Sequence, residues 1–189
     1  MRYNPKTPVK TSEMSTIKIG SQEWASEDLK VTKFRNGEDV PLVTDNTEWF
    51  ELETAAYCIS PDGSHLYNWC AVNDPRGLAP EGFHVPSDEE WTELVEHLGG
   101  EEVAGEQMKA SSWNGTNSSG FNASPSGFRK YWGGLLKEVG YGGYWWTSSA
   151  DGTSLAWYLA LFSDYGGVYR NNGKFQNGFS VRCIKTQIK

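Results

Sequence analysis

The last third of the chain carries the side chains best suited to binding chemistry. Between residues 158 and 176, aromatic rings stand among amide, carboxylate and guanidinium groups. Tyrosine and asparagine combine flat stacking area with hydrogen-bonding groups, and arginine adds a planar cation, a combination that suits sugars or protein epitopes. The candidate contact residues are Tyr158, Phe162, Asp164, Tyr165, Tyr169, Arg170, Asn171, Asn172, Lys174 and Gln176. For each of them the alternative stays open that it is a solvated turn residue at a sheet edge.

No catalytic motif accompanies these residues. The sequence has no G-x-S-x-G elbow, no P-loop, no G-x-G-x-x-G and no H-E-x-x-H. His65, His84 and His97 are scattered without the spacing of metal ligands. A structural Ca²⁺ ion held by loop carboxylates stays open as an alternative, although no EF-hand pattern supports it. The sequence therefore predicts a domain that is not an enzyme and that carries no cofactor.

The bulk composition predicts one loop-rich α+β domain. The chain has 189 residues, which suits a single domain with one sizeable core. Its mean hydropathy is -0.58, and it has 9 tryptophans and 21 glycines, so aromatic side chains joined by glycine-rich turns must supply much of the core. The net charge of -7 and the absence of Lys/Arg runs argue against nucleic-acid partners.

The N-terminal residues predict a flexible arm rather than a secretion signal (leader). Residues 1–15 are polar and contain Pro5 and Pro8, which favours a flexible arm ahead of a domain over residues 16–189. The arm is either a frayed terminus or a strap to a larger assembly. No apolar leader and no membrane-length run is visible, so we expect a soluble chain without membrane insertion, and a trimmed leader stays open.

Three cysteines, Cys58, Cys70 and Cys183, form no metal-binding pattern. Their odd number favours buried free thiols, with a Cys58–Cys70 bridge as the alternative.

The first half of the chain contains two recognisable local patterns. Two short alternating runs around Gly20-Ser21 predict a hairpin over 16–25. Residues 34–56 read as loop with an edge strand near 40–43, held to the core by Trp49 and Phe50.

The clearest helix follows Pro86. Ser87 and Glu90 form a capping box, and Trp91, Leu94, Val95 and Leu98 share one apolar face before Gly99 ends the helix. A weaker helix is predicted over Glu101–Lys109. Residues 111–127 read as polar loop, in which three N-x-S/T sequons are interpreted as turns rather than glycosylation sites.

The last fifty residues predict a β-sheet. Residues 144–148 and 155–162 read as strands, and 164–167 as a turn. Asn171-Asn172-Gly173, flanked by 168–170 and 174–175, predicts a hairpin turn. Residues 179–183 alternate like a half-buried closing strand. The tryptophans assigned to the core are Trp91, Trp145, Trp146 and Trp157.

Seven blocks, taken in order, carry a family resemblance. They are residues 19–24, 66–69, 79–91, 98–100, 120–129, 144–149 and 178–183. In this order they resemble the Fibrobacter succinogenes major paralogous domain over about residues 16–185. The resemblance implies a C-type lectin-like fold, shared with formylglycine-generating enzymes and variable proteins of diversity-generating retroelements. It implies paired N- and C-terminal strands, two helices flanking short antiparallel sheets, and a displayed ligand face without family-wide catalytic residues.

One departure from the family pattern concerns the cysteines. Members often have Cys-Pro-x-Gly-Trp before the main helix, where this chain has Ala79-Pro80-Glu81-Gly82-Phe83. Cys183 therefore lacks the disulfide partner that the resemblance implies, which fits folding outside an oxidising compartment. The enzyme relatives depend on a C-terminal cysteine pair, and Cys183 stands there alone.

Three functions remain in view, in order of preference. The first is an adhesin-like recognition domain that binds a surface glycan or protein receptor through its C-terminal sheet and loops. The second is a structural component of a phage virion, fibre or capsid decoration, with virion or fibre proteins as partners and a homo-oligomer as an open alternative. The third is a divergent enzyme on the lectin-like scaffold. The expected location is a virion or cell surface as part of an assembly, and otherwise the cytoplasm.

Overall fold

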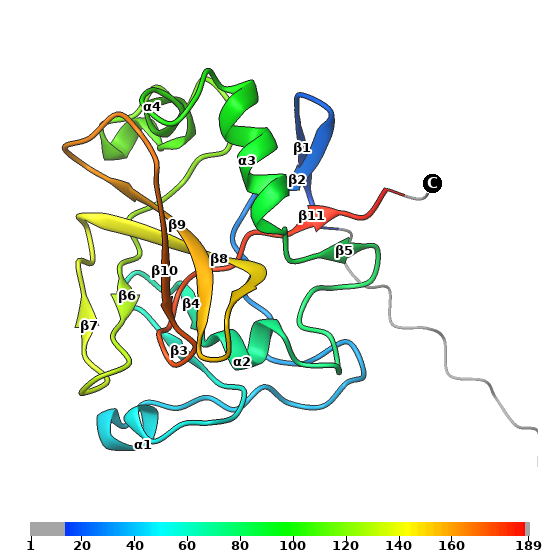
Figure 1. The fold of residues 1–189 in the computed structure, drawn as a ribbon, viewed down its shortest axis with the longest axis vertical. Helices are drawn as coiled ribbons and strands as arrows, with labels where there is room; N and C mark the ends of the chain where they lie inside the picture. Colours follow the sequence, from blue (N-terminus) through cyan, green and yellow to red (C-terminus); the bar gives the residue numbers. More distant parts are fainter. Residues whose placement is uncertain (1–13, 188–189) are drawn as a thin grey trace, which may run out of the picture.

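The computed structural model describes residues 14–187, so the predicted arm lies almost wholly outside the described residues. Within them the fold is α+β and loop-rich, with several short antiparallel sheets (Figure 1). Met14 packs against the core, and the Ser15 carbonyl accepts a hydrogen bond from the Ser26 amide at 2.9 Å.

The two ends of the domain meet in a four-stranded sheet. The predicted hairpin is confirmed: β1 (Thr16–Ile19) pairs antiparallel with β2 (Gln22–Ala25) around Gly20, whose φ is +61°. β11 (Ile184–Lys185) pairs antiparallel with β2 on one side and with β5 (Phe83–His84) on the other. The expected pairing of N- and C-terminal strands is therefore confirmed.

A three-stranded antiparallel sheet occupies the centre of the fold. Its strands are β8 (Gly142–Asp151), β9 (Leu155–Phe162) and β10 (Tyr169–Lys174), in the order β10-β9-β8. The predicted turn at 164–167 is confirmed, because it connects β9 to β10.

The predicted hairpin at Asn171-Asn172-Gly173 is wrong. These residues lie inside β10 and pair in register with Tyr158, Trp157 and Ala156 of β9. An Asn-Gly hairpin turn needs positive φ, which Gly173 does not have. Its small size serves packing instead, since a Cβ there would lie 3.2 Å from the Tyr158 ring.

The main helix begins and ends where the sequence predicts. In α3 (Asp88–His97) the Ser87 hydroxyl accepts from the Glu90 amide, and the Glu90 carboxylate accepts from the Ser87 amide. Gly99 has a φ of +98°, which only glycine adopts easily. The weaker helix, predicted over Glu101–Lys109, is shorter than expected: α4 covers Ala104–Met108.

Short elements complete the chain. They are α1 (Asn46–Phe50), β3 (Tyr57–Ile59), β4 (His65–Tyr67), α2 (Trp69–Val72), the 3₁₀ turn η1 (Ser111–Trp113), β6 (Phe128–Arg129) and β7 (Leu136–Lys137). The three sequon asparagines, Asn114, Asn117 and Asn122, have φ values of 54°, 51° and 56°, which confirms them as turn residues.

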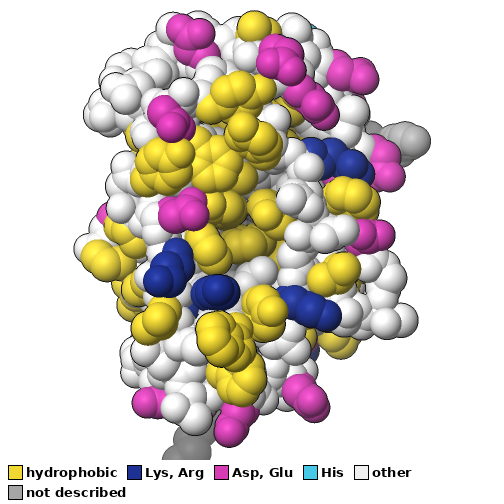
Figure 2. Space-filling model, turned by 60° about the vertical axis from the view of Figure 1, so that its left-hand side comes forward, with side chains coloured by type: hydrophobic (Ala, Val, Ile, Leu, Met, Phe, Trp, Pro, Cys, Tyr) yellow, Lys and Arg dark blue, Asp and Glu magenta, His cyan; other side chains and the backbone are white. Residues whose placement is uncertain are grey.

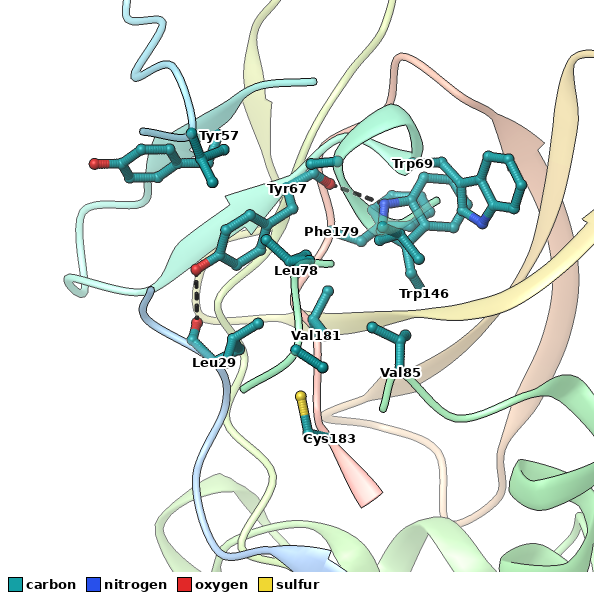
Figure 3. Packing of buried hydrophobic residues seen from close by; sticks show 14 of the residues in the cluster. Leu29, Tyr57, Tyr67, Trp69, Leu78, Val85, Trp146, Phe179, Val181 and Cys183 are labelled. Carbon is teal, nitrogen blue, oxygen red and sulfur yellow. Dashed lines mark hydrogen bonds between the residues drawn. The ribbon is translucent and has the colours of Figure 1, made fainter. Parts of the chain in front are cut away.

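The core forms on both faces of the central sheet. Alternate residues of β8 point to opposite sides: Tyr144 and Trp146 join one apolar cluster, and Trp145 joins the other with α3. Figure 3 shows the first cluster, in which the Trp146 indole donates to the Tyr67 carbonyl at 2.9 Å. The predicted aromatic core is thus confirmed for Trp91, Trp145 and Trp146, all fully buried.

Two predicted core residues are more exposed than expected. Trp157 is only half-buried, and the Arg170 guanidinium covers its ring at 3.7 Å. Phe50 is 47% exposed at the end of α1, whereas its neighbour Trp49 is fully buried as predicted. The edge strand expected at 40–43 is reduced to a bridge between Leu42 and Tyr57.

The predicted closing strand over 179–183 is not a continuous strand, because only Phe179 and Ser180 form isolated bridges, to Tyr67 and Trp145. The segment is also buried on both faces rather than on one. Phe179, Val181 and Cys183 do face the first core cluster together, as their alternation predicts. The intervening Ser180 and Arg182 are also buried, at 1% and 2% exposure. Arg182 tolerates this burial because its guanidinium donates to Asp28 at 2.6 Å and to the Phe121 carbonyl at 2.7 Å.

A second buried arginine holds the β6–β7 hairpin to α1. Arg129 is 3% exposed and stacks on Trp49 at 4.5 Å. Its guanidinium donates to the carbonyls of Gly134, Val43, Thr44 and Asp45 and to the Asn46 side chain, at 2.7 to 3.1 Å. Backbone carbonyls, rather than a carboxylate, therefore satisfy this charge.

The cysteines are all free thiols. Burial raises the pKa of Cys58 to about 11 and that of Cys183 to about 12.

Within residues 14–187, none of the helices has the length and apolar character needed to cross a lipid bilayer. In that same stretch, His, Cys, Asp and Glu side chains form no group of three or more that could hold a metal ion.

Candidate functional site

An aromatic pocket of about 320 Å³ lies at one end of the central sheet. We call it the tyrosine pocket, and its lining residues are Tyr141, Phe162, Asp164, Tyr165 and Tyr169. The antiparallel register brings them together: Gly142 pairs with Phe162 at the start of β8, and Tyr169 pairs with Ala160 at the start of β10. The β9–β10 connection supplies Asp164 and Tyr165.

The aromatic rings of the pocket meet at steep angles. The Phe162 and Tyr169 rings are 5.3 Å apart at 74°, and the Tyr165 and Tyr169 rings are 4.8 Å apart at 43°. Tyr141 lies against Phe162 at 5.6 Å and 41°. Rings inclined in this way do not form one flat platform.

Carboxylates hold the phenol groups of the pocket in place. The Tyr141 hydroxyl donates to Asp164 at 2.9 Å, and the Tyr165 hydroxyl donates to Glu102 at 3.1 Å. These hydrogen bonds raise the pKa of both phenols, because the phenolate would face a carboxylate. Behind the pocket the buried Tyr144 hydroxyl donates to Glu138 in the same way, and burial with this bond raises the pKa of Tyr144.

A buried lysine fixes the β9–β10 connection. Lys109 is 1% exposed, and its ammonium donates to the carbonyls of Phe162 at 2.8 Å and Tyr165 at 2.7 Å. Burial lowers the pKa of this ammonium. The backbone of the same loop is also bonded to the α4 region, since the Glu106 amide donates to the Gly166 carbonyl at 2.6 Å. Hydrogen bonds within the protein therefore hold the loop that lines the pocket.

Close packing of glycines makes Gly105 of α4 the contact point for this loop. A Cβ at Gly105 would lie 2.0 Å from the Gly167 carbonyl oxygen. We expect Gly105→Ala to lower the free energy of unfolding by about 1–3 kcal/mol, because this clash outweighs the gain of about 1 kcal/mol that alanine brings to a helix interior. Urea denaturation followed by tryptophan fluorescence measures the change.

The matched control for this substitution is Gly166→Ala. A Cβ at Gly166 would meet its nearest atom at 3.8 Å, an ordinary contact, so stability should stay within about 0.5 kcal/mol. Equal stability of the Gly105→Ala variant and the wild type would show that the loop does not rest on α4 as described.

The structure does not bring all ten predicted contact residues together. Phe162, Asp164, Tyr165 and Tyr169 come together in the tyrosine pocket. Tyr158 is half-buried on the same side of the sheet and packs against Phe179 at 4.7 Å.

Arg170, Asn172 and Lys174 point to the opposite side of β10. Arg170 binds Asp88 at the start of α3 through two hydrogen bonds of 2.7 and 2.5 Å. It lies at the rim of a second cavity, of about 260 Å³, between α3 and the sheet. Asn172 donates to Asp151 at 2.6 Å, and Lys174 donates to Ser154 at 3.3 Å. These contacts tie β10 to its neighbours.

The remaining two residues lie apart from the pocket lining. Asn171 is exposed, and its side-chain oxygen accepts from the Asn172 amide at 2.8 Å. Gln176 is half-buried, and its carbonyl accepts from the Trp49 indole at 2.9 Å.

Sequence reasoning missed Tyr141, Glu102 and Lys109. Tyr141 stands in a glycine-rich stretch that reads as a plain turn, and Lys109 looks like an ordinary surface charge. A large aromatic between glycines just before a strand was the available signal for Tyr141. Nothing local marks Lys109, whose partners are more than fifty residues away.

Comparison with known proteins places most of the chain in one family model. The model described as Fibrobacter succinogenes major domain matches residues 17–185. No curated protein and no solved structure matches the chain. The C-type lectin-like fold therefore stays a prediction.

Proposed function

The chain belongs to the Fibrobacter succinogenes major domain family, and from the geometry of its site we propose that it is a non-catalytic recognition domain for a surface glycan or protein receptor. The observation that carries the proposal is the tyrosine pocket at the end of the central sheet, with its loop held by hydrogen bonds. Functional residues concentrate on loops that a rigid scaffold positions, and Lys109 and α4 provide that support.

Exposed apolar side chains extend this binding surface. The hairpin patch consists of Tyr131, Trp132, Leu135, Leu136 and Val139, each between 36% and 64% exposed. Figure 2 shows hydrophobic side chains gathered down the centre of the face that comes forward from the left of Figure 1, where β6 and β7 lie. Contiguous apolar surface of this kind is typical of interaction sites, and tryptophan and tyrosine often contribute much of the binding energy there.

The chemistry of Cys183 supports a non-catalytic role. A reactive cysteine needs an accessible thiolate, often with its pKa lowered by a neighbouring cation. Cys183 is fully buried among apolar side chains, and its pKa is raised to about 12. This thiol suits packing rather than the chemistry of the enzyme relatives.

Binding of the purified chain to a glycan array and to intact bacterial cells tests the proposal. We expect Tyr169→Ala and Trp132→Ala each to weaken receptor binding by about tenfold or more, since truncation of an interface aromatic commonly costs over 1 kcal/mol. Tyr169 is 50% and Trp132 is 64% exposed, so both variants should keep their fold.

Ile59→Ala is the control for this experiment. Ile59 is 46% exposed on β3 and belongs to neither the tyrosine pocket nor the hairpin patch. Binding that all three variants retain in full would count against the proposed surface. Failure of the wild-type chain to bind any glycan or cell would count against the recognition function.

A further inference from the structure

The tyrosine pocket is acidic as well as aromatic. Asp164 belongs to its lining, Glu102 is bonded to Tyr165, and Glu138 is bonded to Tyr144 behind it. The nearby cation is Lys109, which is buried and donates to backbone carbonyls. Three carboxylates beside one buried ammonium give the pocket a field that favours a positively charged ligand.

The inclination of the rings favours a compact cation over a sugar. A pyranose stacks on a flat aromatic surface, whereas the rings here stand at 41° to 74° to one another. Rings that meet at such angles offer no single flat surface on which a sugar ring could stack. The faces of aromatic rings carry negative potential, and a cation that lies against such a face is attracted to it.

The hydroxyl groups of the pocket strengthen the same preference. The Tyr141 hydroxyl donates its hydrogen bond to Asp164, and the Tyr165 hydroxyl donates to Glu102. A phenol that donates to a carboxylate has a more electron-rich ring, and its hydroxyl is no longer available to a sugar oxygen. The volume of about 320 Å³ has room for an ammonium head and several methylene groups.

We propose that the tyrosine pocket is a cage for an alkylammonium group, such as a lysine side chain or its methylated forms. Asp164 supplies the opposing charge at the wall, and Tyr141, Phe162, Tyr165 and Tyr169 supply the ring faces. The inference rests on the proposed recognition function and names the ligand chemistry of the same surface.

A titration with two isosteric probes tests this inference. Choline carries a trimethylammonium head, and 3,3-dimethylbutan-1-ol has the same shape without the charge. Followed by NMR chemical-shift changes at Tyr141 and Tyr169, choline should bind at least about tenfold more tightly than the neutral alcohol. n-Butylammonium, in a parallel titration, distinguishes a primary ammonium, as in lysine, from a quaternary one.

Two variants and a control locate the binding site. Asp164→Asn removes the charge and keeps the shape, and Tyr169→Ala removes one ring; each should weaken choline binding by about fivefold or more. Phe50→Ala deletes an aromatic ring that is 47% exposed on α1, outside both the tyrosine pocket and the hairpin patch, and should leave choline binding unchanged.

Equal binding of choline and the neutral alcohol would overturn the inference, as would equal losses in Tyr169→Ala and Phe50→Ala. The failure of this inference is separable from the failure of the proposed function. Receptor binding that needs Tyr169 but shows no preference for ammonium would overturn the cage and keep the recognition domain. Absence of both choline binding and receptor binding would overturn both.

Discussion

An Arg182→Met variant is expected to lose about 3–5 kcal/mol of unfolding free energy, because removing one member of a buried ion pair leaves the other charge uncompensated. The Arg182 side chain is 2% exposed, and its partner Asp28 is 8% exposed. The guanidinium also donates to the carbonyls of Ala25 and Ser26 at 3.3 Å. Methionine fills a similar volume but satisfies none of these acceptors.

Urea denaturation of the Arg182→Met variant measures the loss, and Arg76→Met is the control. Arg76 makes the same kind of ion pair, with Asp74 at 2.8 Å, but its side chain is 34% exposed. Surface ion pairs contribute about 0–1 kcal/mol, so this control should change little. Similar losses in the two variants would mean that burial of Arg182 does not govern its contribution.

The second large effect is expected at Arg129, where even lysine should not substitute. We expect Arg129→Lys to lower the free energy of unfolding by about 2–4 kcal/mol, because buried carbonyls left without a donor cost about 1–3 kcal/mol each. The planar guanidinium reaches five acceptors on two segments of the chain. An ammonium is a compact point charge with three donors and cannot span them.

Hydrogen exchange localises the effect of the Arg129→Lys variant. Amides around α1 and the β6–β7 hairpin should lose protection first, since Arg129 joins these two regions. Arg76→Lys at the surface should leave the same amides unchanged. Full protection of both regions in the Arg129→Lys variant would contradict this role for the guanidinium.

The sequence predicts those elements whose determinants lie close together in the chain. The hairpin around Gly20 and the helix start at Ser87 depend on residues within a few positions of one another, and both are confirmed. Gly99 likewise marks the helix end by its own backbone preference. Local chemistry is therefore enough to predict these structures.

Predictions from the sequence are wrong where the structure of a segment depends on partners far away in the chain. Asn172-Gly173 has the strongest local signal for a turn, yet pairing with Trp157 and Ala156 of β9 holds it extended. The alternation of 179–183 predicts that one face of the segment is exposed to solvent. Arg182, on that face, instead pairs with Asp28, 154 residues earlier, and both are buried. Nothing in the residues around Arg182 indicates a partner so far away in the sequence.

In the candidate site, too, some features depend on nearby residues and others on distant ones. The sequence predicts four of the pocket residues because binding-type side chains are concentrated in one strand–turn–strand segment. They are Phe162, Asp164, Tyr165 and Tyr169. Tyr141 joins them only through the register of β8 against β9. Composition can therefore identify a binding segment, whereas the shape of a pocket depends on register and on supports such as Lys109.

The pairing of β2 with β11 determines how the domain is displayed. Both ends of the described fold leave from one four-stranded sheet, with Trp24 opposite Ile184. In Figure 1 this sheet lies on the right, and the β6–β7 hairpin lies on the left. A linker before β1 or after β11 would attach to the domain on the side where this sheet lies. The hairpin patch, on the opposite side in Figure 1, would then face away from the linker. Copies joined in series or inserted into a loop of a host protein would keep that orientation, with no change to the binding surface itself.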